Sequence, residues 1–213
     1  MSTTAHANTA DTILASFADV ALAPHAHGGH GPVRQLSVSG TLRRSGSLQL
    51  EYRLSAALDQ VRLAPSTCHA QRRDGLWRHT CFELFAARNA EPAYCEFNFT
   101  PGGDWAAYCF SGYRAARQDA PQRRIEVTTR ASGHDGLLRL QAALDLGAAL
   151  GLDAATLSAG ALRLNATAIV EDTDGALSYW AVHHPRAQPD FHDREGFRIA
   201  LAGPARAAAG GRP

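Results

Sequence analysis

Residues 94–110 read Tyr94-Cys95-Glu96-Phe97-Asn98-Phe99-Thr100-Pro101-Gly102-Gly103-Asp104-Trp105-Ala106-Ala107-Tyr108-Cys109-Phe110. Two alternating runs flank a Pro-Gly-Gly-Asp turn, which predicts an antiparallel β-hairpin. If Phe99 lies opposite Trp105, then Phe97 faces Ala107 and Cys95 faces Cys109, all on one apolar side that belongs to the core. The opposite side then pairs Glu96 with Tyr108, Asn98 with Ala106 and Tyr94 with Phe110. This second face places a carboxylate and an amide among aromatic rings.

The preceding run, residues 76–85, extends this mixed face. Phe82 and Leu84 are expected to point to the core, which leaves Trp77, His79, Cys81 and Glu83 on the other side. Glu83 and Glu96 then become neighbours on adjacent strands. Two like charges facing each other need compensation, from an arginine such as Arg78 or Arg114, a cation, a shared proton or the hydroxyl groups of a ligand.

Period-two alternation recurs along the rest of the chain and defines the fold class. The runs are residues 48–54, 125–129, 138–144, 162–170 and 197–201, separated by Gly- and Asp-rich turns. Only residues 11–22 and 144–152 are predicted as short helices. The chain is therefore predicted to be all-β, an antiparallel β-sandwich of the jelly-roll or immunoglobulin-like kind with one or two short helices. We expect a single domain over residues 11–203 between flexible tails at 1–10 and 204–213.

Composition argues against several classes of function. The 213 residues include 21 basic and 20 acidic side chains, a net charge of +1, so no strong field attracts nucleic acid. The basic residues are all arginine, which removes Schiff-base lysine chemistry. No secretory signal is recognised and no apolar run reaches the length needed to span a bilayer, so we expect a cytoplasmic protein without a membrane partner.

Four cysteines, Cys68, Cys81, Cys95 and Cys109, occur without any C-x-x-C pair. We interpret them as free thiols in a reducing compartment. The alternative is a cross-strand disulfide between Cys95 and Cys109, which depends on the hairpin register and on oxidation.

A late segment, residues 183–193, contains three histidines and two aspartates and suggests a metal site. His183 and His184 point to opposite sides of an extended chain, however, so at most one of them can join a site with His192. We favour a structural role, in which Asp190 or His192 fixes a loop through backbone hydrogen bonds, and we expect no metal site.

The aromatic and polar residues of the mixed face match the needs of sugar recognition. A flat ring covers the C–H face of a sugar, and planar donors and acceptors match its hydroxyl groups. Two alternatives remain: the rings are simply core residues, or the carboxylate pair performs glycosidase chemistry, which needs two groups about 5 to 10 Å apart.

The chain also resembles the bacterial DOMON-like proteins, relatives of the family 9 carbohydrate-binding modules. The resemblance lies in Asp74-Gly75-Leu76-Trp77, Thr80-Cys81-Phe82-Glu83-Leu84-Phe85, Glu96-Phe97-Asn98-Phe99-Thr100-Pro101, Trp105-Ala106-Ala107-Tyr108, Gly112-Tyr113-Arg114, Ser178-Tyr179-Trp180-Ala181 and Pro189-Asp190-Phe191-His192. It implies a sandwich of ten or eleven strands that binds a sugar or a haem. The sugar-binding relatives clamp their ligand between tryptophans, for which Trp77, Trp105 and Trp180 are the candidates here.

We therefore expect a small-ligand-binding domain for a carbohydrate or a similar polyhydroxylated molecule, with binding rather than catalysis and no cofactor. The predicted ligand-binding residues are Trp77, His79, Glu83, Glu96, Asn98, Trp105, Tyr108, Arg114, Trp180 and His192. The alternatives are a haem-binding module using His79, His183 or His192, and a hydrolase or lyase using Glu83 and Glu96. The resemblance implies methionine and histidine as haem ligands, and Met1 is the only methionine of the chain.

Overall fold

A computed structural model describes residues 11–65, 70–89, 91–159 and 162–201. These residues form twelve strands and two short α-helices, which confirms the all-β antiparallel class. Two of the strands, β7 (Gln118–Asp119) and β12 (Ile199–Leu201), are only two and three residues long, and they bring the count above the expected ten or eleven. The predicted tails at 1–10 and 204–213 lie outside the described residues.

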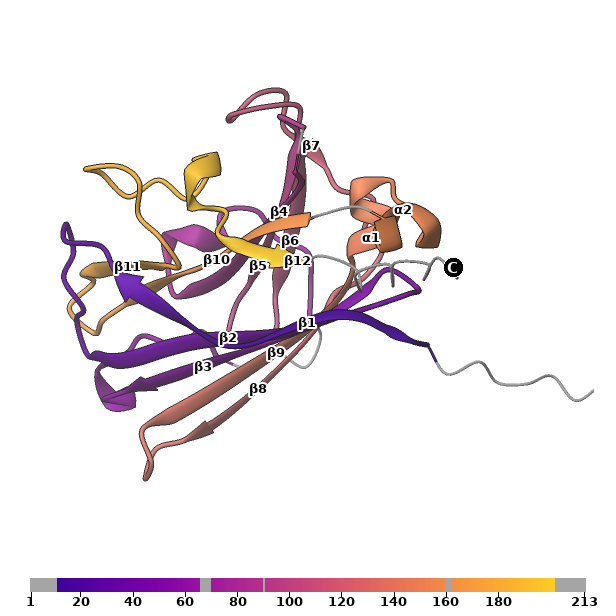
Figure 1. Ribbon diagram of the computed structural model, residues 1–213. Coiled ribbons are helices and arrows are strands. Elements are labelled where there is room, and N and C mark those ends of the chain that lie inside the picture. Colours follow the sequence, from indigo (N-terminus) through magenta and orange to yellow (C-terminus); the bar gives the residue numbers. More distant parts are fainter. Residues whose placement is uncertain (1–10, 66–69, 90, 160–161, 202–213) are drawn as a thin grey trace, which may run out of the picture.

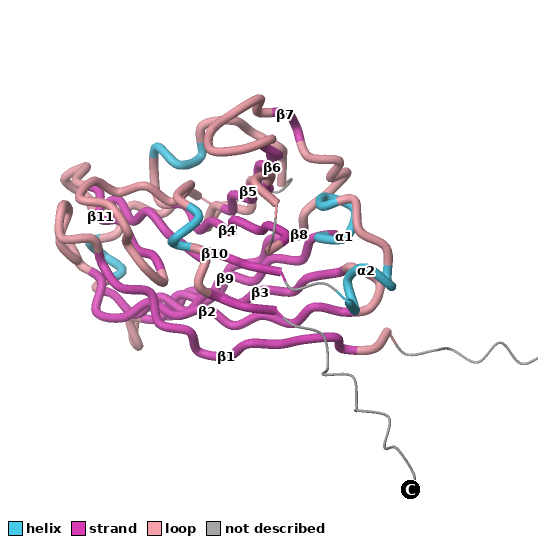
Figure 2. The backbone as a smooth tube through the Cα atoms, turned by 45° about the horizontal axis from the view of Figure 1, so that its top comes forward, coloured by secondary structure: helices cyan, strands magenta, loops and turns pink. Residues whose placement is uncertain are grey.

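The strands form two layers that curl around one core (Figures 1 and 2). The first layer, sheet A, runs in the order β1 (Ile13–Pro24), β2 (Val33–Arg43), β3 (Ser47–Ala56), β9 (Leu137–Asp145) and β8 (Glu126–Ser132). The second layer, sheet B, runs β7, β6 (Trp105–Phe110), β5 (Tyr94–Phe99), β4 (Cys81–Arg88), β10 (Leu162–Glu171) and β11 (Leu177–Ala181), and β12 pairs with β10. Strand β1 joins the layers, because its last residues Ala23 and Pro24 pair with β11.

The prediction of a helix over residues 11–22 is wrong, because these residues form most of strand β1. Two register shifts interrupt its pairing with β2, between Ile13 and Ala15 and between Phe17 and Val20. Asp19 sits at the second shift with φ +48°, and its N–H donates to the Ser39 hydroxyl. Such bulges insert extra residues into a strand, so the apolar residues lose their period of two and imitate helical spacing.

The second predicted helix is present in a shorter form, α1 (Leu146–Leu150), with a further helix α2 (Ala154–Ala159) after it. Asp145 caps α1 by accepting a hydrogen bond from the Ala148 N–H at 2.8 Å. Gly151 ends it in the left-handed conformation, with φ +63°, that glycine adopts without strain.

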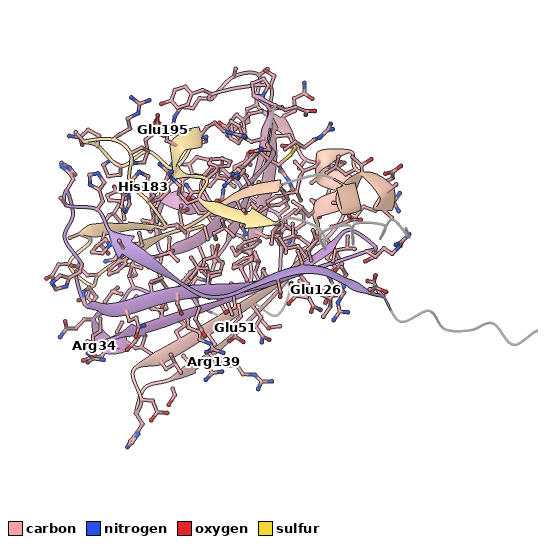
Figure 3. All side chains as sticks on the ribbon, viewed as in Figure 1. Arg34, Glu51, Glu126, Arg139, His183 and Glu195 are labelled. Atoms are coloured by element: carbon pink, nitrogen blue, oxygen red, sulfur yellow. A yellow bond between two sulfur atoms is a disulfide. The ribbon has the colours of Figure 1, made fainter. Side chains whose placement is uncertain are left out.

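The main core fills the space between the sheets (Figure 3). Phe82, Leu84, Phe97 and Phe99 from sheet B are fully buried there, as predicted, and meet leucines and Tyr52 of sheet A. A second, smaller cluster lies on the other face of sheet B and includes Phe85, Tyr94, Phe110, Phe191 and Phe197. The late loop that carries Phe191 covers this face, so both sides of sheet B are occupied and strands β4 and β5 are almost continuously buried.

Candidate functional site

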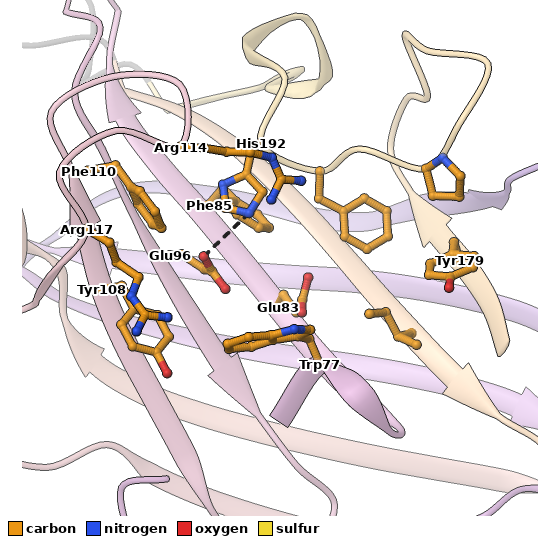
Figure 4. Close-up of a pocket in the computed structure, with 13 residues that line it drawn as sticks. Trp77, Glu83, Phe85, Glu96, Tyr108, Phe110, Arg114, Arg117, Tyr179 and His192 are labelled. Carbon is orange, nitrogen blue, oxygen red and sulfur yellow. Dashed lines mark ion pairs between the residues drawn. The ribbon is translucent and has the colours of Figure 1, made fainter. Parts of the chain in front are cut away.

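A cavity of about 360 Å³ opens on the outer face of sheet B, away from the main core (Figure 4). Its floor comes from strands β4, β5, β6, β10 and β11, and its walls come from three connecting segments. The lining residues are Trp77, Glu83, Phe85, Glu96, Tyr108, Phe110, Arg114, Arg117, Ile169, Tyr179, Pro189, Phe191 and His192. A volume of this size falls in the range of small-molecule sites.

The hairpin register explains why Glu96 and Tyr108 reach the floor. Phe99 pairs with Trp105 and Cys95 with Cys109, as the sequence predicts. Because side chains alternate along a strand, this register sends Glu96 and Tyr108, which are directly opposite each other, to the outer face. Strand β4 follows the same parity, so Glu83 and Phe85 join them there.

Glu83 and Glu96 form a buried carboxyl pair, with exposed fractions of 2% and 5%. Glu83 lies opposite Asn98, and Glu96 lies opposite Phe85, so the two carboxyls are diagonal neighbours on β4 and β5. The Thr167 hydroxyl donates to Glu83 Oε2 at 3.1 Å, and the Asn98 amide donates to Glu96 Oε1 at 2.7 Å. The pair was expected from the sequence, and the structure places both carboxyls in one cavity.

Burial controls the ionisation of this pair. It raises the pKa of Glu83 well above the ordinary value, and the neighbouring Glu96 charge raises it further. Burial also raises the pKa of Glu96, against the opposing effects of the Asn98 hydrogen bond and of Arg114 and Arg117. Because the two carboxyls are buried neighbours on adjacent strands, each opposes ionisation of the other, and the arrangement favours one shared proton on the pair. Asn98 Oδ1 is buried and has no hydrogen-bond partner among the described residues.

A chain of hydrogen bonds orients His192 on the opposite wall. The Arg114 backbone N–H donates to the Tyr94 hydroxyl at 3.1 Å, and that hydroxyl contacts His192 Nδ1 at 2.8 Å. Donation of the Tyr94 hydroxyl hydrogen to His192 Nδ1 would place the proton of the neutral ring on Nε2. His192 Nε2 lies 3.8 Å from Glu96 Oε2, the contact dashed in Figure 4. Burial, with the Arg114 charge, lowers the pKa of His192 to about 4, so this histidine is neutral at neutral pH.

The loop that carries His192 has the structural role that the sequence suggested for it. Asp190 accepts the His192 backbone N–H at 3.2 Å, the Arg114 guanidinium at 2.9 Å and the Tyr113 hydroxyl at 2.6 Å. This one carboxylate therefore joins the late loop to the segment after β6. It fixes both walls of the cavity.

Aromatic rings form the remaining wall. Trp77, from the short 3₁₀ helix Leu76–Arg78, meets Tyr108 edge to face with ring centroids 6.2 Å apart. The Tyr108 hydroxyl donates to Asp74 Oδ1 at 2.6 Å, and burial together with Asp74 raises the pKa of Tyr108. The Arg117 guanidinium lies over the Tyr108 ring at 4.7 Å from its centroid. Figure 4 shows Trp77 on one side of the carboxyl pair and His192 on the other.

Six of the ten predicted ligand-binding residues line the cavity: Trp77, Glu83, Glu96, Tyr108, Arg114 and His192. Asn98 does not line it but holds Glu96. His79 lies elsewhere, with Nδ1 2.7 Å from Glu171 Oε2, because it follows the 3₁₀ helix and is not part of β4.

Trp105 and Trp180 lie in the main core, not in the cavity. Trp105 pairs with Phe99, so its side chain points to the core on the same face as Phe97 and Phe99. The Trp180 indole N–H donates to the Ser178 hydroxyl at 3.1 Å within the core. Of the three tryptophans considered for a clamp, only Trp77 lines the cavity, with Tyr108, Phe85 and Phe110 as other aromatic residues of the lining.

Several lining residues were missed from the sequence. Phe85 and Phe110 lie two residues after Glu83 and Tyr108 on the same strands, so their side chains point to the same face. Extending the alternation by two residues on each strand would have found them. Arg117, Ile169, Tyr179, Pro189 and Phe191 come from segments whose approach to the hairpin carries no local sequence signal.

The structure corrects the interpretation of the cysteines as free thiols. Cys95 and Cys109 form a disulfide on the core side of the hairpin, and Cys81 is free and buried. Cys68 lies outside the described residues. Both disulfide sulfurs lie close to the Ala149 carbonyl oxygen of α1, at 3.4 and 3.6 Å, so the bond packs against the helix on the side opposite the cavity.

No cluster of three or more candidate metal ligands occurs among the described residues. His184 Nε2 contacts the Ala23 carbonyl oxygen at 2.9 Å, which ties the late loop to β1. Of the three histidines considered for haem, only His192 lines the cavity. None of the helices in the described ranges is long and apolar enough to cross a membrane.

Comparison with solved structures supports the fold. The chain is similar to a crystal structure of a "putative carbohydrate-binding protein" from Bacteroides uniformis, with a TM-score of 0.60 and 15% sequence identity. The match covers 88% of this chain and 84% of that one. No family model matches the sequence, and a search of curated proteins finds no match. At this identity the similarity extends to the fold of almost the whole domain.

Proposed function

We propose that this protein is a small-ligand-binding β-sandwich whose cavity on sheet B takes a saccharide or a similar polyhydroxylated molecule. One observation carries the proposal: the cavity combines the ring of Trp77 with a buried carboxyl pair, Glu83 and Glu96, and with the neutral His192. A ring face suits the C–H surface of a sugar, and the polar groups can both donate to and accept from its hydroxyls. The resemblance to DOMON-like proteins and family 9 carbohydrate-binding modules is part of this proposal, and the fold of the Bacteroides protein supports it.

The test is a titration of the purified protein with neutral and acidic mono- and disaccharides, followed by calorimetry and by tryptophan fluorescence. Of the three tryptophans, Trp77 lines the cavity and the other two lie in the core, so a bound sugar should change the emission of Trp77. Trp77→Ala should weaken binding by about tenfold or more, since it removes a large stacking surface. His79→Ala, which alters an exposed neighbour outside the cavity, should bind like the wild type. Absence of heat and of any emission change across the whole panel would reject the proposal.

A second function, acid–base hydrolysis, is favoured by the shared proton of the carboxyl pair. One carboxyl can be protonated while the other is ionised, as general acid–base catalysis requires. Glu83→Gln separates the two functions. A hydrolase should lose its turnover of aryl glycosides in this variant, whereas a binding protein shows no turnover in either form and keeps its affinity within a few fold.

A further inference from the structure

Two arginines stand at the mouth of the cavity, above the carboxyl floor. Arg114 and Arg117 both follow β6 and both line the cavity. Arg114 has φ +51°, a conformation that is costly for a residue with a side chain, and its N–H is held by the Tyr94 hydroxyl. The backbone at Arg114 is thus fixed in an unfavourable conformation.

The two arginines differ in their partners. Arg114 Nη2 donates to Asp190, which also accepts the Tyr113 hydroxyl. Within the described ranges, Arg117 has no acidic partner within 4.0 Å, although eleven pairs between other arginines and carboxylates meet that distance. Its guanidinium lies over the Tyr108 ring. A stacked guanidinium keeps its edge N–H groups available for a planar anion.

The floor compensates this charge only in part. A carboxyl pair that shares one proton keeps a single negative charge, which lies near both Arg114 and Arg117, while His192 is neutral and Asp190 is already paired with Arg114. The cavity therefore presents hydroxyl-binding groups at its base and one unpaired guanidinium at its mouth.

We propose that the ligand is an anionic sugar, whose carboxylate or phosphate group pairs with Arg117 at the mouth while its hydroxyl groups face Glu83 and Glu96. This inference rests on the proposed function and narrows it to a class of sugar. A cationic ligand does not fit, because it would enter past two guanidinium groups. A non-specific attraction for anions is weak, since the net charge of the chain is only +1.

The experiment compares sugars that differ only in the anion. Calorimetric titrations use D-glucuronate and D-galacturonate, their methyl esters, the parent hexoses and the hexose 6-phosphates. In the wild type, the anionic sugar should bind tenfold to a hundredfold more tightly than its ester or parent hexose, as expected for one charge-assisted pair. Arg117→Gln should remove this preference, so that the anionic sugar and its neutral counterpart bind this variant with similar affinity. Arg123→Gln removes a positive charge from an exposed site outside the cavity and should leave the preference intact.

The outcomes separate this inference from the proposed function. A preference for uronates over hexose phosphates, or the reverse, supports it and identifies the anion, provided that it depends on Arg117. Equal binding of anionic and neutral sugars, or a preference that survives Arg117→Gln, overturns the inference and leaves the proposed function standing. If no sugar of the panel binds, both are overturned. Arg117 is exposed, so Arg117→Gln should fold normally. A thermal unfolding transition at the wild-type temperature checks this.

Discussion

At the scale of single residues, burial acts in opposite directions on the two kinds of titratable group that face each other across the cavity. It raises the pKa of Glu83 and lowers the pKa of His192 to about 4. Burial thus favours the neutral form of both groups. A neutral carboxyl and a neutral imidazole can each donate and accept hydrogen bonds, which a charged pair cannot do.

The Glu83 shift predicts a pH-dependent stability. In the pH range above the ordinary glutamate value, the native state holds a proton that the unfolded state has lost, so stability falls as the pH rises. One such proton contributes at most about 1.4 kcal/mol per pH unit. Glu83→Gln should therefore gain stability relative to the wild type between pH 5 and 8, measured by urea unfolding. Glu126→Gln, an exposed change on β8, is the matched control and should follow the wild-type curve.

The His192 shift has the opposite sign. Between pH 6.5 and 4 the unfolded chain binds a proton that the native imidazole refuses, so stability falls as the pH falls. The loss over this range is on the order of 3 kcal/mol. His192→Asn keeps an acceptor for the Tyr94 hydroxyl but cannot be protonated, so its curve should be flatter than that of the wild type. His134→Asn, at a highly exposed site, should not flatten it; equal slopes in all three proteins would contradict the assignment.

At the scale of elements, the β5–β6 hairpin carries different chemistry on its two faces. Its core face holds the Cys95–Cys109 disulfide and its outer face holds Glu96 and Tyr108. The disulfide therefore stabilises the strand pair from the face opposite the cavity, and neither cysteine lines the cavity.

Removal of this disulfide should destabilise the protein without abolishing the cavity. Closing a loop of 14 residues is worth about 3 kcal/mol in the chain-entropy model. The double variant Cys95→Ala/Cys109→Ala should lose about this much free energy of unfolding, and a reductant should lower the stability of the wild type but not of the variant. A wild type that is insensitive to reductant under unfolding conditions would show that the bond does not form in solution.

At the scale of the whole molecule, the two sheets are linked directly beneath the site. Tyr52 of β3 is fully buried, and its hydroxyl donates to the Glu83 backbone carbonyl at 2.6 Å. Its ring packs against Phe82 with centroids 5.2 Å apart. The core thus holds the position of β4, and with it the depth at which Glu83 lies.

Tyr52→Phe tests this link. The variant keeps the ring and loses one buried hydrogen bond, so it should lose about 1 kcal/mol of unfolding free energy. Tyr113→Phe removes a hydroxyl bonded to Asp190 from a largely exposed ring, and should cost less. Chemical unfolding of both variants measures these losses of unfolding free energy. Equal losses in the two variants would argue against a special role for the hydrogen bond between Tyr52 and the Glu83 carbonyl.

The alternation of residues 94–110 was sufficient to predict the hairpin, its register and the face on which Glu96 and Tyr108 lie. The same parity predicted the burial of Phe82 and Leu84 and the nearness of Glu83 to Glu96. These features follow from a period of two and a turn, which are local properties of the chain. The bulges in β1 break that period, and residues 11–22 were accordingly misassigned.

The sequence by itself therefore determined the fold class, the hairpin and the carboxyl pair. Only the tertiary structure decided that Trp105 and Trp180 lie in the core, that the late loop delivers His192 and Phe191, and that Arg117 reaches the mouth. The physical reason is distance along the chain. Local alternation fixes which face a side chain occupies, whereas the closure of a cavity depends on long-range packing among segments that carry no period of their own.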